Sequence, residues 1–371
     1  MSISRRNAIL LICAGAAGVA GAAAGGFALT RTPGRALEPW SQAGRYDDPR
    51  LNALSWAILA PNPHNRQPWI ADLREAGKII LLRDPDRNLP QTDPNNRQLT
   101  IGMGCFIELL VLAAANEGWR VDVQLFPQGL DGPVAHADFV EGAAADPLFR
   151  HAADRRSCKE PFEARAVPAN LVSALSSHAM IVDAPEPVSA LKKLTWDAWM
   201  TEYETTRTFK ESVDLMRFGK AEIEANPDGI DLGGTFLESL MLVGQLNREL
   251  QMDPQSFAAK EGVRMYKEML EATPAYAVLT SPTNTPADWI EAGRRWLRLN
   301  LATTGMGLAL HPVSQALQEF AEMAPHHAKT HELLAKPGQT VQMLGRLGYG
   351  PATPHTPRWR LETRLLNGPT G

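Results

Sequence analysis

The chain has 371 residues, and at about 150 residues per domain this length predicts about two domains with a sizeable core. Hydrophobic residues make up 44% and charged residues 21%, as in an ordinary globular protein. The net charge of −4 is uneven, since the first 36 residues hold four arginines and no acidic residue, which leaves 33 basic against 41 acidic groups in the remainder. This acidic balance argues against a nucleic-acid-binding protein.

The amino terminus, residues 1–36, has the pattern of an export signal. Ser4-Arg5-Arg6 precedes an uncharged run, Asn7–Leu29, that consists largely of Ala and Gly. This pattern resembles a twin-arginine signal, although Ala8 stands where such signals usually have Phe. Gly34-Arg35-Ala36 offers a cleavage point after Ala36, which predicts a periplasmic or otherwise extracytoplasmic protein. The alternative is a retained membrane anchor, because the uncharged run is long enough to span a bilayer.

The next hundred residues, 37–146, predict a first α+β half. A helix is expected over Asp48–Leu59, with Asp47 or Asp48 before Pro49 at its start. Two strands are expected at 70–72 and 78–83, a long apolar helix at 101–118, a strand at 120–126, and a loop with another strand over 129–146.

Residues 147–371 predict a second half with a large insertion. Short helices are expected at 147–154 and 168–178, a strand at 276–280, a buried helix at 287–304 and a strand at 308–311. Between them, residues 190–275 are charged, amphipathic and helical, with a Gly-rich break at 226–234. An insertion of about 195–285 is far longer than a simple connection, as expected of a lid.

The two halves repeat at an offset of 189 residues. Five positions are identical over a fifteen-residue window in the two long helices: Gly104 and Gly293, Leu110 and Leu299, Leu112 and Leu301, Ala113 and Ala302, Gly118 and Gly307. Because Leu, Ala and Gly are common, helix packing alone could produce these identities. The matching order of helix and strand favours two copies of one unit.

Trp56–Trp69, WAILAPNPHNRQPW, carries one charge in fourteen residues, Arg66. Pro61 and Pro63 end the helix, and the following amide and imidazole groups suit recognition of a flat heteroaromatic ligand. The alternative is a helix-ending turn. APNPHNRQPW resembles the APSxxNxQPW segment of the flavin-dependent nitroreductase family, in which this loop lies against FMN across a dimer interface. The resemblance implies FMN contacts for five residues: Pro61, Asn62, His64, Asn65 and Gln67.

A second candidate segment is RRSCKEPF, residues 155–162. In an extended chain Arg155, Ser157 and Lys159 project to one side, so two cations and a hydroxyl converge, as suits a phosphate. A solvated basic turn is the alternative. The segment resembles the R-x-S-x-R/K motif of nitroreductases, which implies that Arg155 and Ser157 hold the FMN phosphate. Lys159 would then reach the N1/O2 edge of the ring and stabilise negative charge on the reduced flavin.

The carboxy-terminal segment LGRLGYGPATPHTPRWRLETRL resembles the closing segment of the family, where a basic pair binds the phosphate. Arg358 matches the second cation of that pair, Thr356 replaces the first, and His355 is a candidate substitute. The loop after the second repeat's strand crosses the flavin in the family, which implies contacts for Ser314 and Gln315.

The two motifs are distributed unevenly between the halves. The first half has the PNPHNRQPW loop without an R-x-S-x-K segment, and the second has RRSCK while residues 178–190 lack the loop. The resemblance is to the tandem-repeat, Acg-like branch, in which one polypeptide mimics the dimer. It implies a nitroreductase-like α+β fold with two tandem sheet-and-helix halves, an intrachain pseudo-dimer, and one complete FMN site.

Other motifs do not predict sites. His326, His327 and His331 lack an acidic or Cys partner at ligand spacing, which favours solvated helix histidines over a metal site. The three cysteines have no metal-like spacing and form no disulfide framework. GMGCFI at Gly102 lacks the third glycine of a dinucleotide fingerprint. No nucleic-acid partner and no metal are expected.

The resemblance implies an FMN-dependent oxidoreductase that transfers two electrons through flavin N5 to a small-molecule acceptor such as a quinone or a nitroaromatic. The sequence identifies no catalytic side chain, and the reductant is open because an exported protein has no NAD(P)H supply. The alternative function is a flavin-binding or flavin-sequestering protein whose lid covers the FMN and excludes nicotinamide.

Overall fold

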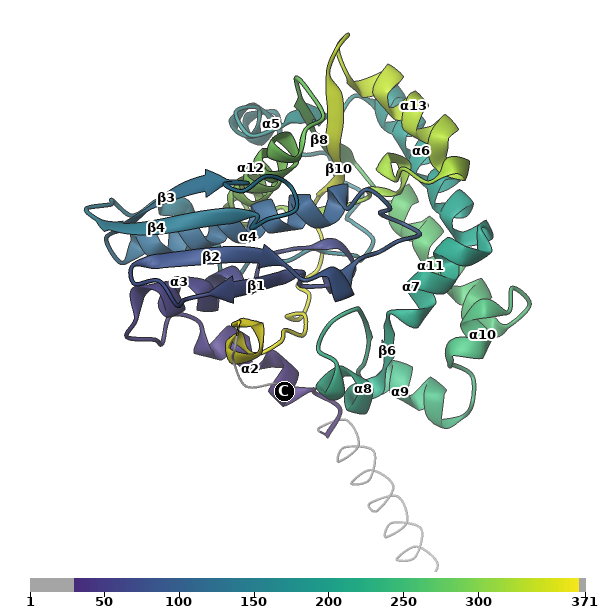
Figure 1. Ribbon diagram of the computed structural model, residues 1–371. Helices are drawn as coiled ribbons and strands as arrows, with labels where there is room; N and C mark the ends of the chain where they lie inside the picture. Colours follow the sequence, from purple (N-terminus) through teal and green to yellow (C-terminus); the bar gives the residue numbers. More distant parts are fainter. Residues whose placement is uncertain (1–29, 367–371) are drawn as a thin grey trace, which may run out of the picture.

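The computed structural model describes residues 30–366 and contains two four-stranded sheets, each paired with one long helix (Figure 1). The first sheet is antiparallel in the order β1-β2-β4-β3. The first half, which contains this sheet, has the elements α2 (Gly34–Gln42), α3 (Pro49–Ala57), β1 (Trp69–Asp72), β2 (Lys78–Arg83), α4 (Arg97–Asn116), β3 (Trp119–Leu125) and β4 (Ala135–Glu141).

The second sheet is antiparallel in the order β5-β8-β10-β9. The second half, which contains this sheet, has the elements η3 (Pro147–His151), α5 (Ala169–Leu175), β5 (Met180–Val182), β8 (Ala275–Ser281), α12 (Pro286–Gly305), β9 (Ala309–Pro312), α13 (Ala324–Leu334) and β10 (Thr340–Gly348). Strand for strand, this is the order of the first sheet, and α12 occupies the place in the second half that α4 has in the first. The expected α+β fold with two sheet-and-helix halves is confirmed.

The two long helices cross where the repeat predicts equivalence. A Cβ atom added to Gly104 would lie 2.1 Å from the carbonyl oxygen of Ile290, and one added to Gly293 would lie 1.9 Å from that of Ile101. Ile101 and Ile290 are themselves 189 residues apart. The contact is therefore reciprocal, which is the mark of an isologous, two-fold interface. The two halves of one chain pack as a pseudo-dimer about this point.

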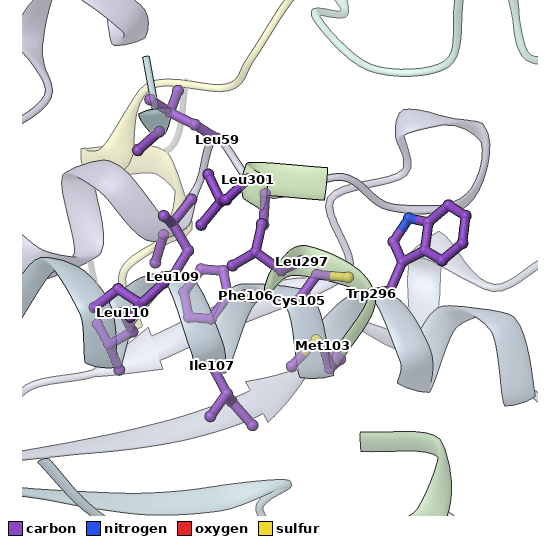
Figure 2. Packing of buried hydrophobic residues seen from close by; sticks show 14 of the residues in the cluster. Leu59, Met103, Cys105, Phe106, Ile107, Leu109, Leu110, Trp296, Leu297 and Leu301 are labelled. Carbon is purple, nitrogen blue, oxygen red and sulfur yellow. The ribbon is translucent and has the colours of Figure 1, made fainter. Parts of the chain in front are cut away.

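The core fills the space around this crossing. Figure 2 shows Phe106, Leu297 and Leu301 among the buried side chains that α4 and α12 bring together. Helix α12 begins with a capping box between Thr285 and Asp288, and Pro286 follows at a first-turn position where its missing N–H costs nothing. Within residues 30–366, α4 is the one helix long and apolar enough to cross a membrane, and it is buried in this core.

The insertion lies between β5 and β8 and forms a separate helical layer, drawn in teal and green in Figure 1. It contains α6 (Pro185–Glu204), α7 (Thr206–Asp214), β6 (Met216–Phe218), α8 (Gly219–Ala225), β7 (Ile230–Leu232), α9 (Thr235–Leu242), α10 (Arg248–Met252) and α11 (Phe257–Glu271). The helical segment begins at Pro185 and ends at Glu271, and β8, which covers the strand expected at 276–280, belongs to the second sheet.

The carboxy-terminal arm, residues 349–366, returns to the first half. The Arg358 amide donates to the Ala36 carbonyl at 2.8 Å, the Tyr46 hydroxyl donates to Glu362 at 3.0 Å, and the Leu366 amide donates to the Ala71 carbonyl at 2.8 Å. Residues 147–371 form the second half, but the last of its described residues pack on α2 and β1 of the first half (Figure 1). This return places Arg358 beside the PNPHNRQPW loop.

The predicted signal falls mostly outside the described residues. The Ser4-Arg5-Arg6 motif and the uncharged run lie in residues 1–29, of which the structure describes nothing. The predicted cleavage point after Ala36 lies within α2, where Ala36 is buried and its carbonyl accepts the Arg358 amide.

Candidate functional site

The PNPHNRQPW loop, residues 61–69, has an unusual backbone. His64, Asn65 and Gln67 all have positive φ, at 47°, 50° and 51°. The left-handed conformation costs a residue with a side chain about 1–2 kcal/mol, and Asn tolerates it best. Such outliers persist only where surrounding structure enforces them, and they cluster at binding sites. The loop is therefore held in a defined shape.

Two amides of the loop provide that enforcement. The Asn62 side-chain oxygen accepts a hydrogen bond from the backbone N–H of Gln67 at 2.7 Å. The Gln67 side chain is fully buried, donates to the Pro227 carbonyl at 2.7 Å, and accepts the Trp359 amide at 2.9 Å. Gln67 thus ties the loop to the insertion and to the carboxy-terminal arm. Both polar atoms of the Gln67 side chain bond to other parts of the protein, so this residue positions the loop. These hydrogen bonds give no support to its predicted contact with FMN.

Arg155 and Arg358, predicted to share one phosphate, converge on one carbonyl. Arg155 Nη2 donates to the Leu59 carbonyl at 3.0 Å, and Arg358 Nη2 donates to the same carbonyl at 3.1 Å. Arg155 Nη1 also donates to the Asn300 side chain at 3.1 Å, and Arg358 Nη1 to that of Asn65 at 2.7 Å. Residues from both halves thus meet at the end of the loop.

The charge of this pair is not neutralised by the protein. Each side chain is 3% exposed, and neither arginine forms an ion pair within residues 30–366. Burial lowers the pKa of Arg155 to about 10, and burial together with the charge of Arg155 lowers the pKa of Arg358 to about 9. Arg358 Nε is buried without a hydrogen-bond partner. Buried cations without an acidic partner are costly, so the pair favours an anion.

Aromatic and neutral groups surround the pair. The Trp40 ring stacks on His355 at 4.0 Å, and the guanidinium groups of Arg156 and Arg358 lie 5.3 and 5.6 Å from its centroid. The Thr356 hydroxyl accepts from Arg358 Nη1 at 2.6 Å. Thr356, which replaces the first cation of the family's pair, therefore orients the second. The half-buried Ser157 makes no side-chain hydrogen bond to another described residue, so its hydroxyl is available to a ligand.

Lys159 lies where three parts of the chain meet. Its charge acts on His64 of the loop and on His311 of β9, and it interacts with Asp231 of the insertion. The side chain is exposed, yet desolvation by neighbouring protein lowers its pKa, and Asp231 opposes that shift. Burial, then the charges of Lys159 and Arg66, lower the pKa of His64 to about 4. His64 is therefore neutral at physiological pH, beside the predicted ring-edge cation.

A third group surrounds Gln315, at the start of the 3-10 helix η4 (Gln315–Leu317). The Gln315 side chain hydrogen-bonds to Glu202 of α6 and to Tyr266 of α11. Glu202 also accepts from Ser212 at 3.2 Å and from Gln318 at 3.0 Å, with no cation bonded to it. Burial raises its pKa to about 7. Ser314 makes no side-chain cap bond, and its predicted contact with the flavin stays a prediction.

These groups are linked through β10. Arg346 is fully buried, and its Nη1 lies 3.3 Å from His311 Nδ1, while its charge also acts on Tyr266. Electrostatic interactions thus relate Lys159 to His311 and Arg346 to Tyr266, and Arg346 lies within 3.3 Å of His311. Arg155, Arg358 and the loop form one end of this arrangement, and Glu202 forms the other. Two surface pockets, one lined by Leu89 and Glu211 and one by Phe218 and Leu246, lie apart from it.

Comparison with known proteins gives relatives over most of the chain. The protein called "Putative NAD(P)H nitroreductase Rv3131" of Mycobacterium tuberculosis is 23% identical over 83% of this chain and 88% of its own length. "Putative NAD(P)H nitroreductase acg" of the same organism is 25% identical over 83% of this chain and 92% of its own length. The chain is a homologue of these Acg-type proteins. The resemblance to nitroreductases found in the sequence motifs is thereby confirmed. No family model matches the chain.

Solved structures with partial likeness are also nitroreductases. The FMN-dependent nitroreductase NfnB from Mycobacterium smegmatis in complex with NADPH is 18% identical, with a TM-score of 0.33, over 55% of this chain and 87% of its own. A nitroreductase with bound FMN from Bacteroides fragilis is 12% identical, with a TM-score of 0.31, over 56% of this chain and 90% of its own.

Sequence reasoning missed the side chains that the insertion and β10 contribute. Glu202 and Tyr266 carry no motif, because each lies in a segment whose place in the fold depends on long-range packing, and Arg346 lies at the start of the carboxy-terminal motif segment without a role having been expected for it. One signal was present: Glu202 follows an aromatic helix face, and the rings of Trp199 and Tyr266 stack at 4.4 Å in the structure. Among residues 30–366 no group of metal-ligating side chains occurs. His327 and His331 are neighbours on α13, with ring centroids 4.4 Å apart.

Proposed function

We propose that this Acg-type homologue binds one FMN non-covalently and acts as an oxidoreductase of nitroreductase type. One observation carries the proposal: two buried arginines of the second half, Arg155 and Arg358, converge on the Leu59 carbonyl of the first half without an acidic partner among the described residues. The relatives whose names denote NAD(P)H nitroreductases support the reaction class.

The residues present fit an anionic cofactor. The partnerless Arg358 Nε, the guanidinium of Arg155 and the free hydroxyl of Ser157 would hold the phosphate. Arg forms bidentate contacts with phosphate oxygens, and a hydroxyl adds a neutral donor. Lys159 and the loop at His64 would flank the ring. When bound, FMN supplies hydride chemistry at N5, while the protein supplies position and electrostatics.

The chain's own titratable groups suit such a role. Lys159 brings a positive charge to the junction of loop, β9 and insertion, where it would attract electron density on a bound ring. Glu202 keeps its proton up to about pH 7 because of burial, and Gln315 joins it to Tyr266. A carboxyl group with a pKa near neutrality is able to donate and accept protons at working pH. The acceptor class that we propose is a quinone or a nitroaromatic compound.

The test uses the purified full chain. A flavin spectrum with one FMN per chain is expected, and a ratio of two would contradict a single complete site. Anaerobic reduction by NADPH, by a quinol and by dithionite then identifies the donor class, and reoxidation by menadione or nitrofurazone measures turnover. Bleaching by dithionite alone, without turnover of either acceptor, would show a flavin-binding protein in place of an enzyme. A colourless chain that FMN does not reconstitute would overturn both functions.

A further inference from the structure

The described chain begins against the tip of the insertion. The Arg31 side chain donates to Glu238 of α9 at 2.9 Å, and Lys220 of α8 donates to the Thr30 carbonyl at 3.1 Å. In Figure 1 the purple start of the chain lies beside α8 and α9. The uncharged run Asn7–Leu29 ends immediately before Thr30. No linker therefore separates the apolar run from the insertion.

The same tip exposes large apolar side chains. Phe236 and Leu242 of α9 are 73% and 74% exposed, and Val243 directly after the helix is 68% exposed. Glu238, between them in sequence, is buried against Arg31 and Lys220. The helix thus turns its carboxylate inward and its apolar residues outward. Large apolar side chains this exposed, gathered on one short helix and at its end, favour an interaction surface.

We propose that Phe236, Leu242 and Val243, here called the α9 tip, dock in the interface of a lipid bilayer beside a retained amino-terminal segment. The run Asn7–Leu29 has 23 residues, which as a helix reach about 34 Å and exceed the bilayer core of about 30 Å. Since Thr30 is fixed to α8 and Arg31 to α9, a run that crosses the bilayer places the α9 tip at the membrane surface.

The packing of the first described residues supports retention of the segment. Cleavage after Ala36 would cut α2 in its first turn and remove the residue whose carbonyl accepts the Arg358 amide at 2.8 Å. It would also remove the ion pairs from Arg31 to Glu238 and from Arg35 to Glu224, at 2.9 and 3.1 Å. Residues before the predicted cleavage point are therefore part of the folded unit.

A second copy of the chain is a poorer occupant. Three side chains bury on the order of 500 Å² at most, whereas a stable dimer buries about 800 Å² on each partner. Interfacial docking needs less area, because the amino-terminal segment already holds the protein at the bilayer and each buried apolar group adds to that binding.

The test places a fluorophore on the α9 tip of the full chain in vesicles. Cys105 and Cys158 are buried, so in a Cys13→Ser background Leu242→Cys provides one accessible thiol for an NBD label. The vesicles contain phosphatidylglycerol and phosphatidylcholine, with or without brominated acyl chains. Leu130→Cys is the matched control, because Leu130 is 66% exposed in the turn between β3 and β4, far from α9 in sequence.

We expect bromolipid to quench the label at position 242 at least twofold and to leave the label at 130 unchanged. Equal, weak quenching at both positions would overturn the proposal. A blue-shifted but unquenched label at 242 would also overturn it, since protein and not lipid would then cover the tip. Intact mass of the membrane-extracted chain should include the run Asn7–Leu29, and its loss would contradict retention. These readouts do not depend on FMN binding, so their failure is distinct from failure of the proposed function.

Discussion

The terminal Nη atoms of Arg155 and Arg358 donate to carbonyl and amide oxygens, while Arg358 Nε has no partner and the charge of the pair has no acidic counterpart in the described chain. Hydrogen bonds to neutral acceptors offset part of the cost of burying a cation. A bound phosphate would offset the rest, because it adds charge-assisted bonds to both side chains. The pair is therefore better suited to a liganded protein than to an empty one.

The first prediction concerns these arginines. Arg358→Ala and Arg155→Ala should each raise the dissociation constant for FMN about 10- to 100-fold, since a hydrogen bond to a charged group contributes about 1.5–3 kcal/mol. Flavin fluorescence titration measures the effect. Arg120→Ala, at an exposed ion pair on β3, is the matched control and should leave affinity unchanged. Because both arginines also brace the loop, Arg358→Lys serves as a second variant that keeps the charge. If all four variants bind FMN with the affinity of the parent chain, the two arginines do not form the phosphate site.

Glu202 gives a prediction of pH dependence. Its folded pKa, about 7, is raised by burial above the ordinary value of 4.5, so the folded state binds the proton more tightly than the unfolded state. The associated stability is present below pH 4.5 and is lost as pH rises through 7. At about 1.4 kcal/mol per pKa unit, the total loss is on the order of 3 kcal/mol.

Urea unfolding at pH 5.5 and pH 8.0 measures this loss. Glu202→Gln removes the titrating group while keeping a similar shape, so its stability should change less between the two pH values than that of the parent chain. Glu322→Gln is the control, because its carboxylate is exposed and paired with Arg207. An unchanged pH dependence in the Glu202 variant would contradict the raised pKa.

At the scale of residues, the sequence predicted the motif-bearing side chains best. Arg155 and Arg358 are over 200 positions apart, and only the resemblance connected them. His64 and Lys159 are also brought close by the fold. Gln67 shows the limit: an amide in a polar loop looks available to a ligand, and only the packed structure shows that Pro227 and Trp359 use it.

At the scale of elements, the crossing of α4 and α12 leaves no room for a side chain. Gly104→Ala should lower the free energy of unfolding by about 2–3 kcal/mol or more, because the added Cβ would meet the Ile290 backbone at 2.1 Å and backbone cannot give way locally. Gly293→Ala should lower the free energy of unfolding by a similar amount, because the contact between the two helices is reciprocal. Urea midpoints measure both.

The matched control is Gly262→Ala in α11. There the nearest atom to an added Cβ is the Gln251 side chain at 4.0 Å, and Ala has a higher helix propensity than Gly by about 1 kcal/mol. This variant should be slightly stabilised. Equal midpoints for the variants at 104 and 262 would mean that the two helices do not pack this closely.

Asp228 fixes the insertion to the loop. Its buried carboxylate pairs with Arg66 at 2.8 Å, Arg87 at 2.7 Å and Arg217 at 2.7 Å. Asp228→Asn would leave Arg66 and Arg217 without their anion and Arg87 with Asp84 only, and the loss of a buried partner costs about 3–5 kcal/mol. Hydrogen exchange should become at least tenfold faster at residues 61–67 and 226–232.

The control for this variant is Asp214→Asn, whose carboxylate is exposed and pairs with Lys210 alone. It should leave exchange in both segments unchanged. If exchange at 61–67 does not respond to the change at 228, the insertion does not hold the loop in its left-handed conformation.

Element prediction succeeded where periodicity was strong and failed where long-range pairing decides. The helices α4 and α12 and the strands β2 and β8 were expected within a few residues. The three residues of β5 are too few to show alternation. β10 contains two glycines and an arginine, and it is a central strand only because β8 and β9 pair with it.

At the scale of the whole molecule, the site is assembled within one chain. A homodimer loses an interfacial ligand when its protomers dissociate, because dimer stability depends on protomer concentration. Here Arg155, Arg358 and the loop are covalently connected. The fraction of protein that holds FMN should therefore depend on free FMN alone and stay constant when chain concentration is lowered from 10 µM to 10 nM at fixed FMN. Fluorescence correlation of FMN measures it, and a release that follows chain concentration would indicate an intermolecular site.

The reciprocal contact at Gly104 and Gly293 has a consequence for how such a protein changes over generations. In a true homodimer every substitution is inherited by both partners at once, so a loop cannot be altered on one side and kept on the other. In this chain the two sides are encoded separately, although the glycine contact still relates them by a two-fold rotation. Selection can then preserve the shared centre strictly while the outer parts of each half change independently. One half retains PNPHNRQPW, and the other contains the mainly helical insertion from α6 to α11.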